Sequence, residues 1–122
     1  MLRKPDGLIF VNKPQAWTSF DVVGKLRATL ERDLRTKGHV FSRKKRLKVG
    51  HGGTLDPLAT GLMVVGVGSA TKVLAEYLSG VKGYSASALL GEETDTQDSE
   101  GMMLSRMPTA HVTKSLLEQA AL

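Results

Sequence analysis

The sequence predicts one folded domain of the α/β or α+β class, because apolar strand-like runs alternate along it with amphipathic helical segments. A length of 122 residues is typical of a single domain and leaves no room for a second independent one. With 41% hydrophobic and 24% charged residues, the chain has the composition of an ordinary globular protein, not of a disordered or fibrous one.

The first part of the chain contains a predicted strand and a predicted helix. Residues 7–12 form a short apolar run that stops at Lys13-Pro14, where the missing proline N–H ends the ladder. In the segment that follows, apolar side chains recur at spacings of three and four, which indicates a helix with one buried face. Thr18 or Ser19 is expected to cap it. The apolar side chains of this face are Val22, Val23, Leu26, Leu30 and Leu34.

The alternation continues in the middle of the chain. Residues 62–67 are apolar throughout apart from Gly66, as in a buried strand. A short helix that reaches Leu78 is expected after them, capped by Ser69 or Thr71. Residues 84–90 alternate small polar with apolar side chains and predict a half-exposed strand.

The last part of the chain predicts turns and one more helix. Residues 92–101 are acidic, but they lack the ligand alternation and the glycine of a calcium loop. Because the three histidines are also far apart in the sequence, we expect no metal site. Thr113 is the expected cap of a last helix, which ends abruptly at Leu122.

The composition also predicts where the protein works. Without cysteine there is neither a disulfide framework nor a thiolate metal site, which favours an intracellular protein. The apolar stretch at residues 8–11 is too short for a secretory segment or a membrane span, so no membrane role is expected. We expect the cytoplasm, with the nucleus or the mitochondrion as alternatives.

A run of basic residues lies inside a predicted loop at about residues 35–49. The net charge of the chain is +5, and the run suits contacts with RNA phosphates. A solvated loop and a localisation signal are the alternatives. We expect this loop to become ordered only on binding. The run consists of Arg43, Lys44, Lys45, Arg46 and Lys48.

The glycine-rich segment 50–61 surrounds a single carboxylate, Asp56. Gly52 and Gly53 permit backbone conformations that other residues avoid, and Pro57 restricts the backbone directly after the aspartate. This arrangement suits a nucleophile presented from a turn. The alternative is an ordinary turn in which the aspartate bonds its own backbone.

Residues 66–71 follow a strand and open a helix, as a dinucleotide-binding loop does. The third glycine of that fingerprint is missing, and the chain contains no Gly-Lys-Ser/Thr triplet. We therefore expect no nucleotide cofactor.

Several of these motifs, in this order and spacing, resemble the TruB family of pseudouridine synthases from about Gly7 to the end of the chain. The dyskerin-like, RNA-guided synthases share the aspartate segment, but residues 94–96 favour the branch that modifies tRNA without a guide. The motifs are Lys13-Pro14 with Thr18-Ser19, the segment 50–61, Lys82 with Tyr84, and the segment 90–101.

The resemblance implies an α+β fold with a mixed β-sheet flanked by helices, of which residues 1–122 would be the amino-terminal and incomplete part, without a carboxy-terminal RNA-binding domain. It implies a monomer that converts uridine 55 in the T-arm of tRNA to pseudouridine. Asp56 would be the nucleophile and would attack at the ribose C1′ or at the base C6. No cofactor and no metal are implied.

The resemblance also assigns roles to the neighbours of Asp56. His51 would fill the space left by the flipped base, Tyr84 would pack on the uracil, and Gly52, Gly53 and Thr54 would line the substrate site. Taken alone, a single histidine is more often an ordinary surface residue, and a tyrosine at the start of a strand more often belongs to the core.

Three further features bear on the family's pattern. Lys13 and Pro14 are expected to brace the loop instead of touching substrate, and Ala16 stands where the family often has glycine. The arginine that pairs with the catalytic carboxylate in the family is not found in this chain. A non-catalytic RNA-binding remnant is therefore the alternative to an enzyme.

Overall fold

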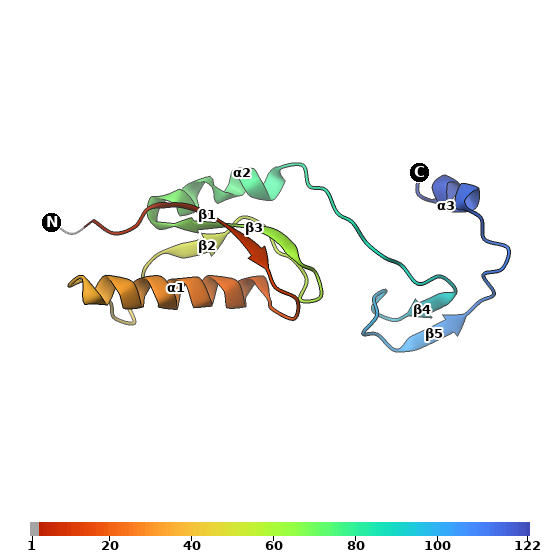
Figure 1. Cartoon of the computed structure of the whole chain (residues 1–122), viewed down its shortest axis with the longest axis horizontal. Coiled ribbons are helices and arrows are strands. Elements are labelled where there is room, and N and C mark those ends of the chain that lie inside the picture. The colour runs from red at the N-terminus through yellow and green to blue at the C-terminus, as the bar shows by residue number, and fades with distance from the viewer. Residues whose placement is uncertain (1–2) are drawn as a thin grey trace. The chain divides into compact units, whose positions relative to one another are not determined.

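The computed structural model describes residues 3–122, and the chain divides between Lys82 and Gly83 into two compact units. Helices and antiparallel strands occur in both units, which confirms the α+β class (Figure 1). The first unit contains β1 (Gly7–Lys13), α1 (Ser19–Thr36), β2 (Val49–His51), β3 (Gly61–Val67), the 3-10 helix η1 (Gly68–Val73) and α2 (Leu74–Ser79). The second contains β4 (Glu92–Thr94), β5 (Met103–Arg106) and α3 (Lys114–Ala120).

The sheet of the first unit has the order β1-β3-β2, with β3 in the centre. Ile9 pairs with Val65 on one side of β3, and Val49 pairs with Val67 on the other. Both pairings are antiparallel, whereas the sequence led us to expect a mixed sheet. A short loop, residues 52–60, joins β2 to β3, and such a short connection is compatible only with antiparallel neighbours.

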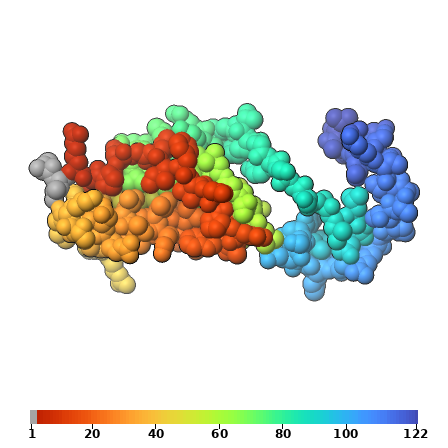
Figure 2. Space-filling model, in the orientation of Figure 1, coloured from red at the N-terminus to blue at the C-terminus, as the bar shows by residue number. Residues whose placement is uncertain are grey.

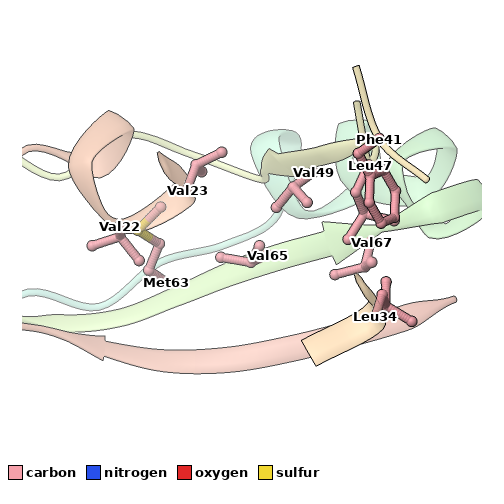
Figure 3. Packing of buried hydrophobic residues seen from close by; sticks show 9 residues of the cluster. All are labelled: Val22, Val23, Leu34, Phe41, Leu47, Val49, Met63, Val65 and Val67. Carbon is pink, nitrogen blue, oxygen red and sulfur yellow. The ribbon is translucent and has the colours of Figure 1, made fainter. Parts of the chain in front are cut away.

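The core lies between this sheet and α1, which covers one of its faces (Figure 3). Side chains alternate along β3, so that Met63, Val65 and Val67 are buried while Leu62 is exposed. Val65 is completely buried, and burying a side chain of this size contributes about 1.5–3 kcal/mol. The buried apolar residues of the cluster are Val22, Val23, Leu34, Phe41, Leu47, Val49, Met63, Val65 and Val67.

Helix α1 begins with a capping box. The Thr18 hydroxyl accepts a hydrogen bond from the Asp21 N–H at 3.0 Å, and the Asp21 carboxylate accepts one from the Thr18 N–H at 2.9 Å. The bonds from the Thr18 backbone N–H and the Thr18 side chain lower the pKa of Asp21. Of the two expected caps, Thr18 is thus the cap, while Ser19 is the first helical residue and is buried.

The basic stretch before β2 is attached to α1, contrary to the expectation that it orders only on binding. The Arg27 guanidinium donates to the carbonyl oxygens of Leu47 at 3.1 Å and Val49 at 2.9 Å. The carboxylate of Glu31 accepts the Leu47 N–H at 2.8 Å. These long-range bonds order the segment without a ligand.

The helical segment after β3 begins as the 3-10 helix η1, and neither Ser69 nor Thr71 caps it. The carboxylate of Asp6 does so instead, by accepting bonds from the Ser69 hydroxyl at 2.5 Å and the Ala70 N–H at 3.0 Å. The bonds from Ser69 and Ala70 lower the pKa of Asp6. A residue from the start of the chain therefore replaces the local cap that the sequence suggested.

In the second unit, β4 and β5 form an antiparallel pair in which Glu92 lies opposite Arg106. Thr113 caps α3 as expected, since its hydroxyl accepts the Leu116 N–H at 3.3 Å. The prediction of a strand at residues 84–90 is wrong, because this segment is exposed and pairs with no strand among residues 3–122. Within the same residues, no helix has the length and apolar character needed to cross a membrane.

Candidate active site

Asp56 lies on the loop between β2 and β3, at the first position of a turn. The Ala59 N–H donates to the Asp56 carbonyl at 3.0 Å, and Pro57 occupies the second position, where its restricted φ suits the turn. The side chain of Asp56 is exposed. Within residues 3–122 no hydrogen bond reaches its carboxylate. The turn is therefore not an Asx turn, in which the aspartate side chain would bond the backbone.

A buried lysine at the end of β1 holds the backbone beside Asp56. Lys13 is 0% exposed, and its ammonium donates to the carbonyl oxygens of Pro14 at 2.9 Å, Trp17 at 2.6 Å and Pro57 at 3.2 Å. These three acceptors match the three N–H donors of an ammonium group. Lys13 therefore braces the loop, as expected from the sequence.

Two further residues fix the backbone on either side of Asp56. The hydroxyl of Ser19 accepts the Leu55 N–H at 3.0 Å and lies 3.3 Å from the Leu55 carbonyl, to which it donates. The N–H of Ala16 donates to the Pro57 carbonyl at 2.8 Å. Ala16 has a φ of 67°, in the left-handed region that favours glycine. Residues from β1, from the turn after it and from α1 thus hold both neighbours of Asp56.

Gly52 and Gly53, which precede Asp56, are required for different structural reasons. A Cβ at Gly52 would lie 2.9 Å from the Tyr77 Cβ, so the close approach of α2 requires glycine there. Gly53 has a φ of 139°, which other residues rarely adopt. His51 is half-buried, and its Nδ1 lies 2.9 Å from the Gly53 carbonyl. Thr54 is exposed beside them.

The remaining sequence-predicted site residues are not part of the loop that carries Asp56. Tyr84 belongs to the second unit and is exposed. The basic run lies near the carboxyl end of α1, where Glu31 and Arg27 hold it, whereas Ser19 at the amino end of α1 contacts the Asp56 loop. Among residues 3–122, no group of three or more histidine, aspartate, glutamate or cysteine side chains is arranged to hold a metal ion.

A shallow hollow opens beside the loop, next to Ala16. It is lined by the aromatic side chains of Trp17 and Phe20, and by Asp21 and Lys25 of α1, which carry opposite charges. Aromatic rings stack on nucleic-acid bases, so such a surface suits an unstacked base. Sequence reasoning missed this hollow. It also missed the contact of Ser19 with the loop, because the Leu55 backbone groups that Ser19 binds leave no trace in the sequence.

Comparison with known proteins shows the family of the chain. Residues 39–122 match the family model of the TruB family pseudouridylate synthase (N terminal domain). The chain is 45% identical over 112 residues to a tRNA pseudouridine synthase B of Parabacteroides distasonis, covering 92% of this chain and 44% of that protein. It is 46% identical over 116 residues to one of Dehalococcoides mccartyi, covering 94% of this chain and 34% of the relative.

A tRNA pseudouridine synthase B of Bacteroides fragilis is similarly related, with 42% identity over 116 residues that cover 95% of this chain and 46% of the relative. The chain thus spans less than half the length of each of these relatives. Because the family model covers most of the chain, including Asp56 and the loop around it, the chain belongs to the TruB family of pseudouridylate synthases.

Proposed function

We propose that the protein converts uridine to pseudouridine in tRNA, with Asp56 as the nucleophile. The observation that carries the proposal is an exposed carboxylate on a loop whose backbone is fixed by Lys13, Ser19 and Ala16. Within residues 3–122 this carboxylate accepts no hydrogen bond. The relatives that match the chain bear the name tRNA pseudouridine synthase B. Uridine 55 in the T-arm is the proposed target.

The reaction is an isomerisation, so it needs no external oxidant or reductant. The target nucleotide first turns out of its stack, because its reacting atoms are out of reach inside a folded arm. Asp56 then adds either to the ribose C1′ or to the base C6, and the bond between C1′ and N1 breaks. The uracil rotates, C5 bonds to C1′, the C5 proton leaves to solvent, and the carboxylate is released. A covalent intermediate divides one difficult step into two easier ones.

The fixed loop supports this chemistry through the position of the carboxylate. A reacting group that is already held in place loses little entropy when it attacks, and good positioning lowers the barrier substantially. Lys13 and Ser19 hold the residues on either side of Asp56. In the proposed complex, His51 fills the space of the flipped base and Tyr84 packs on the uracil, while Gly53 and Thr54 lie beside the substrate.

The test measures tritium release from tRNA labelled with tritium at C5 of uridine, using protein made from the complete reading frame. We expect release by the wild type and by Asp33→Asn, a control that removes an exposed carboxylate on α1. Asp56→Asn should lower the rate by more than about a thousandfold, because it removes the nucleophile at nearly constant shape.

A tRNA with cytidine in place of uridine 55 should release no tritium from that position and should contain no pseudouridine. Unchanged release by Asp56→Asn would contradict the assigned nucleophile. Binding of tRNA without any release by the wild type would favour a non-catalytic RNA-binding protein. Release only after addition of a guide RNA would favour the dyskerin-like mode of action.

A further inference from the structure

The basic residues before β2 form a defined turn. The main chains of Ser42 and Lys45 exchange two hydrogen bonds, of 3.4 and 3.1 Å, so that Arg43 and Lys44 lie at the tip. We call residues 42–48 the basic turn. Its five basic side chains are all exposed, while Leu47 is 3% exposed and belongs to the core. Figure 2 shows this part of the chain, in pale orange to yellow, projecting from the lower surface of the first unit.

The basic turn is attached to α1 by an acidic residue that is itself buried. Glu31 is 1% exposed, and its carboxylate accepts the Leu47 N–H at 2.8 Å and the Arg46 Nε at 2.9 Å. Arg27 donates to the Leu47 carbonyl from the same helix. The turn is therefore preformed and needs no partner to acquire its shape.

Most of the positive charge in the turn is not neutralised inside the protein. Glu31 pairs with Arg46 and, at 3.7 Å, with Arg35. Within residues 3–122, no ion pair involves the other basic residues of the turn, which are Arg43, Lys44, Lys45 and Lys48. Like charges held close together repel one another, and a polyanion relieves that repulsion. The phosphate backbone of RNA is the partner with this chemistry.

A localisation signal is the competing explanation of a basic run. A receptor that bound the run as an extended peptide would have to break the Ser42–Lys45 hydrogen bonds. It would also expose Leu47 and leave the carboxylate of Glu31 buried without its partners, which is costly. The folded turn therefore favours RNA over a receptor groove.

Helix α1 separates the basic turn from Asp56. Ser19 in its first turn contacts Leu55, and Glu31 near its other end contacts Leu47. At a rise of 1.5 Å per residue, the two contact points lie about 18 Å apart along the helix. A side chain of the turn thus does not reach the reacting nucleotide, and it meets a different part of any RNA whose uridine lies at Asp56.

We propose that the basic turn is a second RNA-docking site, which contacts backbone phosphates of the substrate about 20 Å from the reacting uridine. The turn then contributes affinity for the folded RNA and takes no part in the chemical step. The proposal rests on the proposed function for the identity of the RNA, a tRNA. Because phosphate contacts position RNA without reading its sequence, the turn should act equally on different tRNAs.

The first test measures tRNA binding by fluorescence anisotropy over a range of salt concentrations. The variant combines Arg43→Ala with Lys44→Ala, two exposed tip residues whose removal leaves the main-chain bonds of the turn intact. A matched control combines Arg32→Ala with Arg3→Ala, which removes two exposed cations outside the turn that also make no ion pair within residues 3–122. The tip variant should weaken binding about tenfold at roughly 0.1 M salt and reduce the salt slope by about 1.5–2, while the control changes neither as much.

The second test measures the kinetics of tritium release with the same proteins. We expect the tip variant to raise KM by about the loss in affinity and to leave kcat unchanged, since the lost contact is remote from the chemistry. An unchanged Kd and salt slope would overturn the proposal, as would an equal loss in the control or a fall in kcat with KM unchanged.

A localisation signal has its own signature. A tip variant that binds tRNA like the wild type, but no longer carries a fused fluorescent protein into the nucleus, would overturn the docking site in favour of import. Failure of the proposed function is distinguishable, because binding is measured without turnover. Loss of binding in the tip variant, together with no tritium release by the wild type, would keep the docking site and reject the isomerisation.

Discussion

The ammonium group of Lys13 lies 3.2 Å from the carbonyl oxygen of Pro57, so a buried cation at the end of β1 holds the residue that follows Asp56. A buried charge is costly unless hydrogen bonds replace its water. Here the carbonyl oxygens of Pro14 and Trp17 complete the set of acceptors. Stability and the position of the proposed nucleophile therefore depend on the same side chain.

Replacing Lys13 with methionine should lower the free energy of unfolding by about 2–4 kcal/mol, because three carbonyl oxygens lose their charged donor. Tritium release should fall as well, although Asp56 is unchanged. Urea denaturation and the tritium assay measure the two effects. Lys82→Met is the matched control, since the exposed Lys82 also donates to two carbonyl groups and should cost less than about 1 kcal/mol. Equal losses of unfolding free energy in the two variants would contradict this role of Lys13.

Ala16→Gly should stabilise the protein by about 0.5–1 kcal/mol. Alanine at a φ of 67° is strained by about 1–2 kcal/mol, and glycine removes this strain. The relief of strain exceeds the free-energy cost of the additional conformational entropy that glycine loses on folding. The melting temperature, followed by circular dichroism, should rise. Ala28→Gly, in the exposed interior of α1, should instead lower stability by about 1 kcal/mol. A lower melting temperature for Ala16→Gly would show that its backbone is not strained.

Gly52→Ala should destabilise the protein by about 1–3 kcal/mol, because the new methyl group would lie 2.9 Å from the Tyr77 Cβ and force the loop away from α2. Gly24→Ala tests the same change at a site where no other atom of residues 3–122 crowds the new Cβ within 4 Å, and in a helix it should stabilise the protein by up to about 1 kcal/mol. Chemical denaturation compares the two. An unchanged free energy of unfolding in Gly52→Ala would mean that the loop shifts without cost.

Glu31→Gln should lower stability by about 1–3 kcal/mol at neutral pH, because a buried acceptor loses its charge beside Arg46. Burial raises the pKa of Glu31, but the bonds from Arg46 and the Leu47 N–H, with the charges of Arg46 and Arg35, outweigh it and hold the pKa below its usual 4.5. The stabilisation is therefore complete above about pH 4.5 and is lost as the pH falls through the lower pKa of the folded state.

The measurement is urea denaturation of both proteins between neutral and acid pH. The difference between wild type and Glu31→Gln should shrink below the usual pKa of a glutamate, 4.5. Asp33→Asn is the control, since Asp33 pairs with Lys37 at an exposed site, where an ion pair contributes about 0–1 kcal/mol. A difference that grew as the pH fell would contradict the assigned direction of the pKa shift.

Local patterns predicted several elements well. The apolar runs at residues 7–12 and 62–67 correspond to β1 and β3, and the helical periodicity with Thr18 before it corresponds to α1. Thr113 caps α3 as predicted. In each case the signal lies within a few residues of the element, because periodicity and capping depend on neighbouring positions in the chain.

Elements that depend on a distant partner were predicted poorly. The alternation at residues 84–90 indicates an extended chain, but a strand also requires a neighbour, and the structure provides none within residues 3–122. Conversely, β2, β4 and β5 were missed, because the pairing of β2 with β3 and of β4 with β5 cannot be seen in their own few residues. The same reason explains why Asp6, far from η1 in the sequence, replaces the expected local cap.

For the candidate site, the sequence by itself determined the residue and its loop: Asp56 between flexible glycines and a rigid proline, in a segment that resembles one family. The resemblance also led us to expect that Lys13 braces this loop. Only the tertiary structure decided which groups Lys13 binds, that Ser19 holds the loop as well, and that α1 separates the loop from the basic turn. The acceptors of Lys13 are backbone carbonyl groups, which every residue carries. The carbonyl groups of Pro14, Trp17 and Pro57 become acceptors of one ammonium group only when folding brings them together. The sequence therefore cannot show which carbonyl groups Lys13 binds.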